Sequence, residues 1–223
     1  MGKKTLIVDM DPQGNATSGV GIEKNSDVLT MYNIIDGKCS VREAILHTDI
    51  ENLDIIPATV DLAGAEIELV QMPSRERIVK NILARIQDDY DYIMIDCPPS
   101  LGILTLNGLA AADEVLIPMQ CEYYALEGIA DLMNSIKLCK RRLNTHLEIE
   151  GIVLTMYDSR ANLTVQVANE LKRYLPEKVY ETVIPRSIRL SEAPSHGLPG
   201  VVYDKANRGS RGYMLLAEEF CAR

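Results

Sequence analysis

The chain is poor in aromatic side chains. Among its 223 residues there is no Trp, one Phe and ten Tyr. Proteins that hold single-stranded nucleic acid stack its bases on clustered aromatic side chains. The sequence therefore shows no platform of that kind.

Long apolar runs and paired cysteines are also missing. No run approaches the roughly 18–20 residues that a membrane-spanning helix needs, and the N-terminus lacks the apolar core of a secretory signal peptide. The cysteines are odd in number, scattered, and form no Cys-x-x-Cys pair: Cys39, Cys97, Cys121, Cys139 and Cys221. This pattern favours reduced thiols in the cytoplasm over disulfides or a zinc site.

Positive charge is in the minority. The chain has 23 Lys and Arg against 32 Asp and Glu, a net charge of −9. This balance excludes a uniformly basic nucleic-acid binder but allows a local basic patch. We find no linker, low-complexity tract or internal repeat, and the length suits one domain with a substantial core. We therefore expect a single domain over residues 1–223.

Apolar runs that end in an acid are the strongest local pattern. Residues 5–8 run into Asp9, and Asp11 follows before Pro12 and Gly14 end the strand. Side chains of a strand alternate between its two faces, so Asp9 and Asp11 point the same way. Two such acids suit a divalent cation and the phosphates it carries. The alternative is that residues 11–14 form only a turn that Asp9 caps.

A second run, residues 92–95, ends in Asp96 and is followed by Cys-Pro-Pro. Strands that alternate with helices predict an α/β fold with a mostly parallel sheet, doubly wound, with helices on both faces. We expect further strands at 53–57, 115–118, 149–156 and 179–185, and helices at 28–36, 41–47, 62–70, 74–86, 104–112, 126–143, 163–174 and 212–221. Ligands of such sheets bind at the carboxyl ends of the strands.

These strand ends resemble the edge of a nucleotide hydrolase, but a phosphate-binding loop is not found. The pattern G-x-x-x-x-G-K-[ST] supplies backbone amides and a Lys to phosphates. Residues 2–5 (GKKT) are similar to its last part, but they lack the upstream glycine and precede a strand instead of following one.

Five segments in order carry a clear resemblance: VDMDPQGNATSGVGIEK (8–24), IPATVDLAGAEIEL (56–69), YDYIMIDCPPSLGILTLN (90–107), IPMQCEYYALEG (117–128) and VIPRSIRLSEAPSHGLP (183–199). They resemble the ParA/Soj family of chromosome- and plasmid-partitioning ATPases, whose deviant Walker A relatives include MinD. The resemblance implies a P-loop NTPase-like fold, ATP and Mg²⁺ as ligands, and a homodimer when ATP is bound. It also implies nonspecific binding of double-stranded DNA, a ParB-type partner, no membrane, and a cytoplasmic location at the nucleoid.

The resemblance also implies roles for the three acids. Asp11 matches the aspartate that orients the attacking water. Asp9 matches the acid near the phosphate lysine, and Asp96 matches the Walker B acid. Asp9 and Asp96 are thus expected at the nucleotide and at Mg²⁺, which they hold mostly through water.

Two further sites follow from the last segment. Pro185 and Arg186 match the part that lies by the adenine in relatives. Arg189, together with Arg186, matches positions that relatives use for DNA.

The departure from the family lies at the start. Relatives begin with a strand, a K-G-G-V-G-K-T-T loop and a helix, and this sequence starts where their second strand starts. Our hypothesis is an N-terminal truncation, which leaves strand edges exposed and weakens ATP binding, since the acids repel phosphates. The alternative function is a non-enzymatic remnant that binds DNA or a partner without hydrolysing ATP. A third possibility is a chain that folds poorly.

Overall fold

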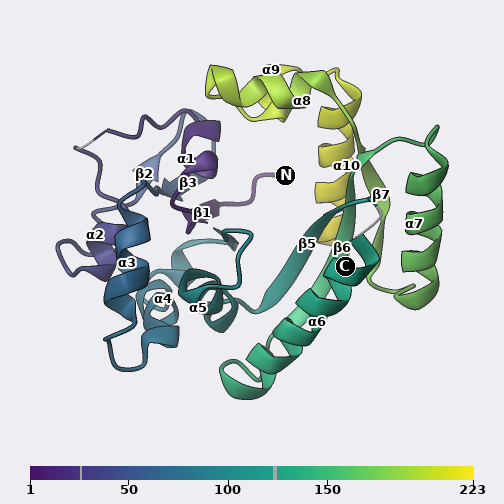
Figure 1. Ribbon diagram of the computed structural model, residues 1–223. Coiled ribbons are helices and arrows are strands. Elements are labelled where there is room, and N and C mark those ends of the chain that lie inside the picture. Colours follow the sequence, from purple (N-terminus) through teal and green to yellow (C-terminus); the bar gives the residue numbers. More distant parts are fainter. Residues whose placement is uncertain (26, 123–124) are drawn as a thin grey trace. The chain divides into compact units, whose positions relative to one another are not determined.

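The computed structural model describes residues 1–25, 27–122 and 125–223 (Figure 1). These residues form two compact units. The first unit comprises residues 1–112 and 141–145, and the second comprises 113–140 and 146–223. The expectation of a single domain stays a prediction, and the two units are described separately.

The sheet of the first unit has the strand order β2-β3-β1-β4. The strand β1 (Thr5–Asp9) lies in the middle and pairs in parallel with β3 (Leu53–Ile56) and with β4 (Tyr92–Asp96). The short strand β2 (Leu46–His47) pairs with β3 in the antiparallel sense. Since the parallel strands run together, their carboxyl ends meet at one edge.

Apolar side chains of β1 pack in the core between this sheet and its helices. Leu6 and Val8 are fully buried in the core cluster of the unit, as is Met10 directly after the strand. The helical elements of the unit are α1 (Asn15–Gly19), α2 (Met31–Ile35), α3 (Leu62–Leu69), η1 (Arg75–Arg77), α4 (Ile78–Leu83), η2 (Gln87–Asp89) and α5 (Ile103–Ala111).

The second unit has a parallel sheet of its own in the order β5-β6-β7. Its core contains Val153, Tyr180, Ile184 and Leu216. Its elements are β5 (Glu114–Gln120), α6 (Ala125–Arg142, whose last two residues belong to the first unit), β6 (Glu148–Tyr157), α7 (Asn162–Tyr174), β7 (Val179–Pro185), α8 (Ile188–Glu192), η3 (Ala193–His196), α9 (Gly200–Tyr203) and α10 (Arg208–Ala222).

The expected α/β class with mostly parallel strands is confirmed, whereas one predicted helix is wrong. Residues 41–47 end in β2, because Leu46 pairs with Ile55 of β3 and the ring Nδ1 of His47 lies 2.6 Å from Oδ1 of Asp54. Pairing with a distant strand has overridden the local pattern.

Each of the two sheets is open and has a strand at either end. Among the described residues, β4 pairs only with β1 and β5 pairs only with β6, so each lies at the end of its sheet. The apolar run of β4 predicts a covered strand, yet its Met94 is 42% exposed. In the described part of the chain, no helix is long and apolar enough to cross a membrane.

Candidate functional site

Asp9 ends β1 and is completely buried. Its Oδ1 accepts the backbone N–H of Asp11 at 3.1 Å. Its Oδ2 accepts both the backbone N–H and the hydroxyl of Thr17, at 2.8 and 2.7 Å. Three donors therefore face a buried carboxylate, which is the arrangement that such a group needs.

The turn after β1 is fixed by short-range hydrogen bonds. Asp11 accepts the N–H of Gln13 on its Oδ1 at 2.9 Å and the N–H of Gly14 on its carbonyl at 2.8 Å. Gly14 has a φ of 60°, and a Cβ placed on it would lie 2.5 Å from the carbonyl oxygen of Ala58. The turn thus needs glycine there. Residues 11–14 thus form a turn that Asp9 caps, and this turn is compatible with both interpretations of Asp11.

Asp96 ends β4 directly beside Asp9 in the strand register. Partial burial and the negative charges of Asp9 and Asp11 raise the pKa of Asp96 to about 6. The side chain of Asp96 accepts no hydrogen bond from the described residues, in contrast to Asp9. Asp96 is exposed to solvent, but no donor of the described residues compensates its charge, and a cation at this position would do so.

The three carboxylates suit only a metal ion that keeps most of its waters. Within the described ranges, no three His, Cys, Asp or Glu side chains form a group that could hold a metal ion directly. The oxygens of Asp9 are already engaged, whereas Asp96 has spare acceptor capacity. Hard carboxylate oxygens in small number suit Mg²⁺, which keeps several waters and binds through phosphates.

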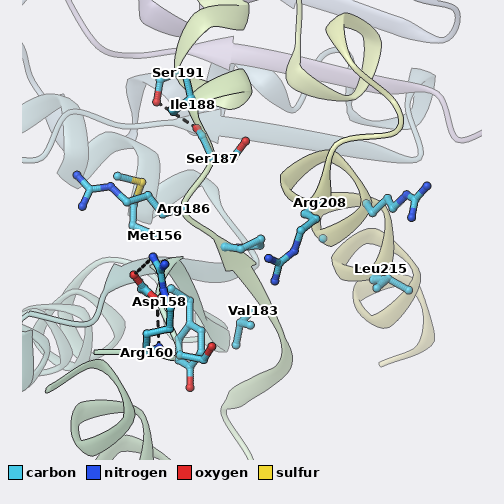
Figure 2. Close-up of a pocket in the computed structure, with 15 residues that line it drawn as sticks. Met156, Asp158, Arg160, Val183, Arg186, Ser187, Ile188, Ser191, Arg208 and Leu215 are labelled. Carbon is cyan, nitrogen blue, oxygen red and sulfur yellow. Dashed lines mark hydrogen bonds and ion pairs between the residues drawn. The ribbon is translucent and has the colours of Figure 1, made fainter. Parts of the chain in front are cut away.

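The second unit contains a cavity of about 1060 Å³ at the carboxyl ends of β6 and β7 (Figure 2). Both residues predicted near the adenine, Pro185 and Arg186, line it. So do Arg160, Arg208 and Arg211, which are joined by apolar side chains that include Met156, Val183 and Leu215. Apolar walls with a few placed polar groups are typical of small-ligand sites.

The arginines of this cavity differ in their pairing. Arg160 binds Asp158 with two bonds, at 2.9 and 2.8 Å, and this contact lowers the pKa of Asp158 to about 2. In the part of the chain that the structure describes, Arg186, Arg208 and Arg211 form no ion pair. Met156, on the same wall, has a φ of 53°, a strained conformation for a side chain of its size.

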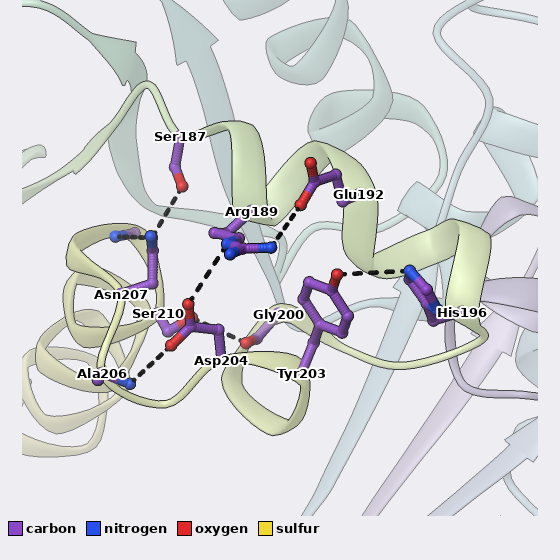
Figure 3. Close-up of polar contacts among 11 residues, drawn as sticks. Ser187, Arg189, Glu192, His196, Gly200, Tyr203, Asp204, Ala206, Asn207 and Ser210 are labelled. Atoms are coloured by element: carbon purple, nitrogen blue, oxygen red, sulfur yellow. Dashed lines mark hydrogen bonds and ion pairs between the residues drawn. The ribbon is translucent and has the colours of Figure 1, made fainter.

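Arg189, the other residue predicted to contact DNA, lies outside the lining of this cavity. Its guanidinium pairs with Glu192 at 3.1 Å and with Asp204 at 3.7 Å (Figure 3). The contact with Glu192, with a smaller contribution from Tyr203, raises the pKa of Arg189. Arg189 thus ties α8 to the end of α9, and its role toward DNA stays a prediction.

The structure brings the predicted acids Asp9, Asp11 and Asp96 to one edge of the first sheet, and Pro185 and Arg186 into one cavity of the second unit. Sequence reasoning missed Thr17, and it noted the basic cluster that contains Arg208 and Arg211 without giving it a role at this cavity. The two arginines stand in a basic stretch, which was a usable signal. Nothing local marks Thr17, because its partners are distant in sequence.

A parallel α/β sheet with acids at the carboxyl ends of its strands places the chain among the α/β proteins that bind ligands at this edge. A family model described as an AAA domain matches residues 1–149. The sporulation initiation inhibitor protein Soj of Bacillus subtilis (strain 168) is 56% identical over 222 residues, which is 100% of this chain and 88% of that protein. The chromosome-partitioning ATPase Soj of Treponema pallidum (strain Nichols) is 52% identical, with 100% and 87% covered. The chain belongs to this family of ParA/Soj chromosome-partitioning ATPases.

Solved structures agree on the fold. Cobyrinic acid a,c-diamide synthase from Mycobacterium smegmatis, with bound ADP and magnesium, is similar with a TM-score of 0.83 and 33% identity over 97% of this chain and 81% of that one. A putative plasmid partition protein from Borrelia burgdorferi B31, bound to AMPPNP, gives a TM-score of 0.80 and 26% identity, with 99% and 86% covered. Both structures contain an adenine nucleotide.

Proposed function

We propose that this chain is a partitioning protein that binds ATP with Mg²⁺, hydrolyses the bond between the β- and γ-phosphates, and binds DNA nonspecifically as a dimer. The observation that carries the proposal is the group of three carboxylates at one sheet edge, where Asp96 has an uncompensated charge. Family membership supports it, since the similar proteins carry partitioning names.

In this proposal each acid has its own task. Asp11, held by its turn, accepts a hydrogen bond from the attacking water and orients it. Asp96 would hold Mg²⁺ through its waters, and Asp9, its neighbour in the strand register, would add negative charge to the site. Bound Mg²⁺ would neutralise charge on the phosphates, and phosphoryl transfer depends mostly on such neutralisation and on positioning.

The second unit would contact the base and DNA. Pro185 offers an apolar surface in the cavity, and Arg186 offers a cation beside it. Arg186 and Arg189 are proposed for DNA, and a ParB-type protein is the proposed partner that stimulates hydrolysis. Contacts of arginine with phosphates are independent of sequence and weaken steeply with salt.

Calorimetry with Mg·ATP, followed by phosphate release, tests the nucleotide part. We expect Asp11→Ala to keep Mg·ATP binding and to lose hydrolysis, and Asp96→Ala to lose the magnesium dependence of binding. Glu218→Ala, an exposed acid in α10, is the control. Absence of Mg·ATP binding by the unaltered chain would overturn the ATPase proposal.

A second candidate is a non-enzymatic protein that binds DNA without nucleotide. It is favoured by Arg186, Arg208 and Arg211, which are exposed and form no ion pair with the described residues. Titration of a duplex of random sequence at several salt concentrations, without nucleotide, distinguishes the two. This candidate predicts binding that weakens with salt and that falls in Arg208→Ala, whereas the ATPase proposal predicts binding only with ATP.

A further inference from the structure

Thr17 occupies an unusual position at the acidic edge of the first unit. It is completely buried in α1, a helix of five residues. Its backbone N–H and its hydroxyl both donate to Oδ2 of Asp9, at 2.8 and 2.7 Å. The same hydroxyl oxygen accepts the backbone N–H of Ala58 at 3.0 Å. One side chain thus links the ends of two neighbouring strands, β1 and β3, to the short helix.

The need for such a link follows from the helix itself. The residue before α1 is Gly14, which has no side chain to accept the first N–H groups of the helix. Asp9, at the end of β1, caps the helix instead, since it accepts the N–H of Thr17. The hydroxyl of Thr17 then holds the carboxylate in one orientation.

The orientation of Asp9 is transmitted to Asp11. While Oδ2 of Asp9 is held by Thr17, Oδ1 accepts the N–H of Asp11 at 3.1 Å. Asp11 in turn accepts the N–H of Gln13 on Oδ1 at 2.9 Å, which leaves Oδ2 as the oxygen that faces other partners. The chain of contacts therefore runs from Ala58 through Thr17 and Asp9 to the backbone N–H of Asp11, the residue whose carboxylate the turn holds.

We propose that Thr17 is the positioning residue of this site and that, through Asp9, it fixes the turn that presents Asp11 to the attacking water. The consequence for hydrolysis rests on the proposed function, whereas the consequence for the turn does not. A misplacement of about 1 Å in a reacting group lowers rates about 100-fold, so a small loss of order at Asp11 has a large effect on turnover.

The test compares Thr17→Val, which keeps the shape and removes the hydroxyl, with Thr17→Ser, which keeps the hydroxyl. Thr164→Val, at another buried threonine in α7, is the matched control. We expect Thr17→Val to lower kcat at least about ten-fold while the Kd for Mg·ATP changes less than about two-fold. Thr17→Ser restores most of kcat, and Thr164→Val leaves it unchanged.

Amide hydrogen exchange tests the same proposal without nucleotide. Protection of the Asp11 and Thr17 amides falls in Thr17→Val, returns in Thr17→Ser, and is unchanged in Thr164→Val. If the unaltered chain hydrolyses no ATP, the proposed function fails and the exchange result alone decides on Thr17. Unchanged protection at Asp11 in Thr17→Val overturns the proposal.

A measurement on the unaltered chain covers the case in which Thr17→Val does not fold. We expect the hydroxyl proton of Thr17 to exchange slowly enough to be seen by NMR, with a contact to the amide proton of Ala58. A hydroxyl proton that exchanges at once with water overturns the proposal as well.

Discussion

The strands β1 and β4 end in aspartates that pair in register, Asp9 and Asp96, but the two carboxylates lie in opposite surroundings. Asp9 is fully buried and accepts three hydrogen bonds from the chain itself. Asp96 reaches solvent, accepts none from the described residues, and has a pKa raised to about 6 by partial burial and by its acidic neighbours.

This difference separates two tasks that the sequence pattern alone presents as one. Both acids follow an apolar strand, and the family resemblance implied that both lie at Mg²⁺. In the structure, the negative charge of Asp9 organises the turn and α1, while that of Asp96 has no partner in the described part of the chain. We infer that the main role of Asp9 is structural, because its hydrogen bonds hold the turn and α1 in place. Asp96 is the acid that is available to a cation.

Replacement of each aspartate by alanine should give the largest contrast. Asp9→Ala leaves three donors without an acceptor in a buried place, and we expect a loss of about 3 kcal/mol in the free energy of unfolding. Asp96→Ala removes a charge that is repelled by its neighbours, and we expect no loss. Urea unfolding at pH 7 measures both. Equal losses in the two variants would show that the hydrogen bonds to Asp9 contribute little.

A substitution at Gly14 tests how rigid the turn after β1 is. Gly14→Ala places a Cβ at a φ of 60° and 2.5 Å from the carbonyl oxygen of Ala58. We expect a loss of about 2 kcal/mol, from backbone strain and displacement of the strand end. Gly19→Ala, at the other end of α1, is the matched control, since a Cβ there meets nothing within 4 Å. Thermal unfolding measures both variants. The same change in Tm in Gly14→Ala and Gly19→Ala would contradict the proposed rigidity of the turn.

The sequence predicted much of the acidic edge, for a simple physical reason. Strand alternation and the parallel sheet place acids at strand ends on one edge, which brought Asp9, Asp11 and Asp96 together correctly. These rules are local in sequence or follow from sheet topology. They needed no knowledge of side-chain contacts.

Contacts between distant residues could not be predicted in this way. Thr17 contacts Ala58, which is 41 residues away, and Arg189 pairs with Asp204 across two further helical segments. The strand β2 also forms only because β3 is beside it. Each of these features depends on tertiary contacts, and the pattern of one sequence segment does not predict which distant segment it contacts.

The pH dependence of stability should also distinguish Asp96 from Asp9. The pKa of Asp96 rises from 3.8 to about 6 on folding, so the folded chain holds this proton more tightly. Its ionisation therefore lowers stability as the pH rises from about 4 to 6, and the effect is absent in Asp96→Asn. Since the side chain is partly exposed, screening reduces the expected difference to about 1–1.5 kcal/mol. Urea unfolding of both chains between pH 4 and pH 7 measures it, and parallel curves would contradict the prediction.

Glu219 of the second unit extends the comparison with the smallest expected effect. Burial opposes its ionisation, but the N–H groups of Glu181 and Thr182, each at 2.9 Å, and Arg223 at 3.0 Å lower its pKa to about 2. Like Asp9, this carboxylate is compensated by the chain. A lowered folded pKa gives stability that is present above the ordinary value of 4.5 and is lost as the pH falls toward 2.

We therefore expect Glu219→Gln to lose about 0.5–1 kcal/mol at pH 7, because the site is close to solvent and screened, and to match the unaltered chain near pH 2. Glu218→Gln, at the exposed neighbouring acid, should show no such dependence. The sign is opposite to that of Asp96→Asn, since one carboxylate is stabilised by donors and the other is repelled by acids. The stability of Glu219→Gln and that of Asp96→Asn, each relative to the unaltered chain, should therefore change with pH in opposite directions. A change in the same direction would show that hydrogen bonds do not distinguish these two carboxylates.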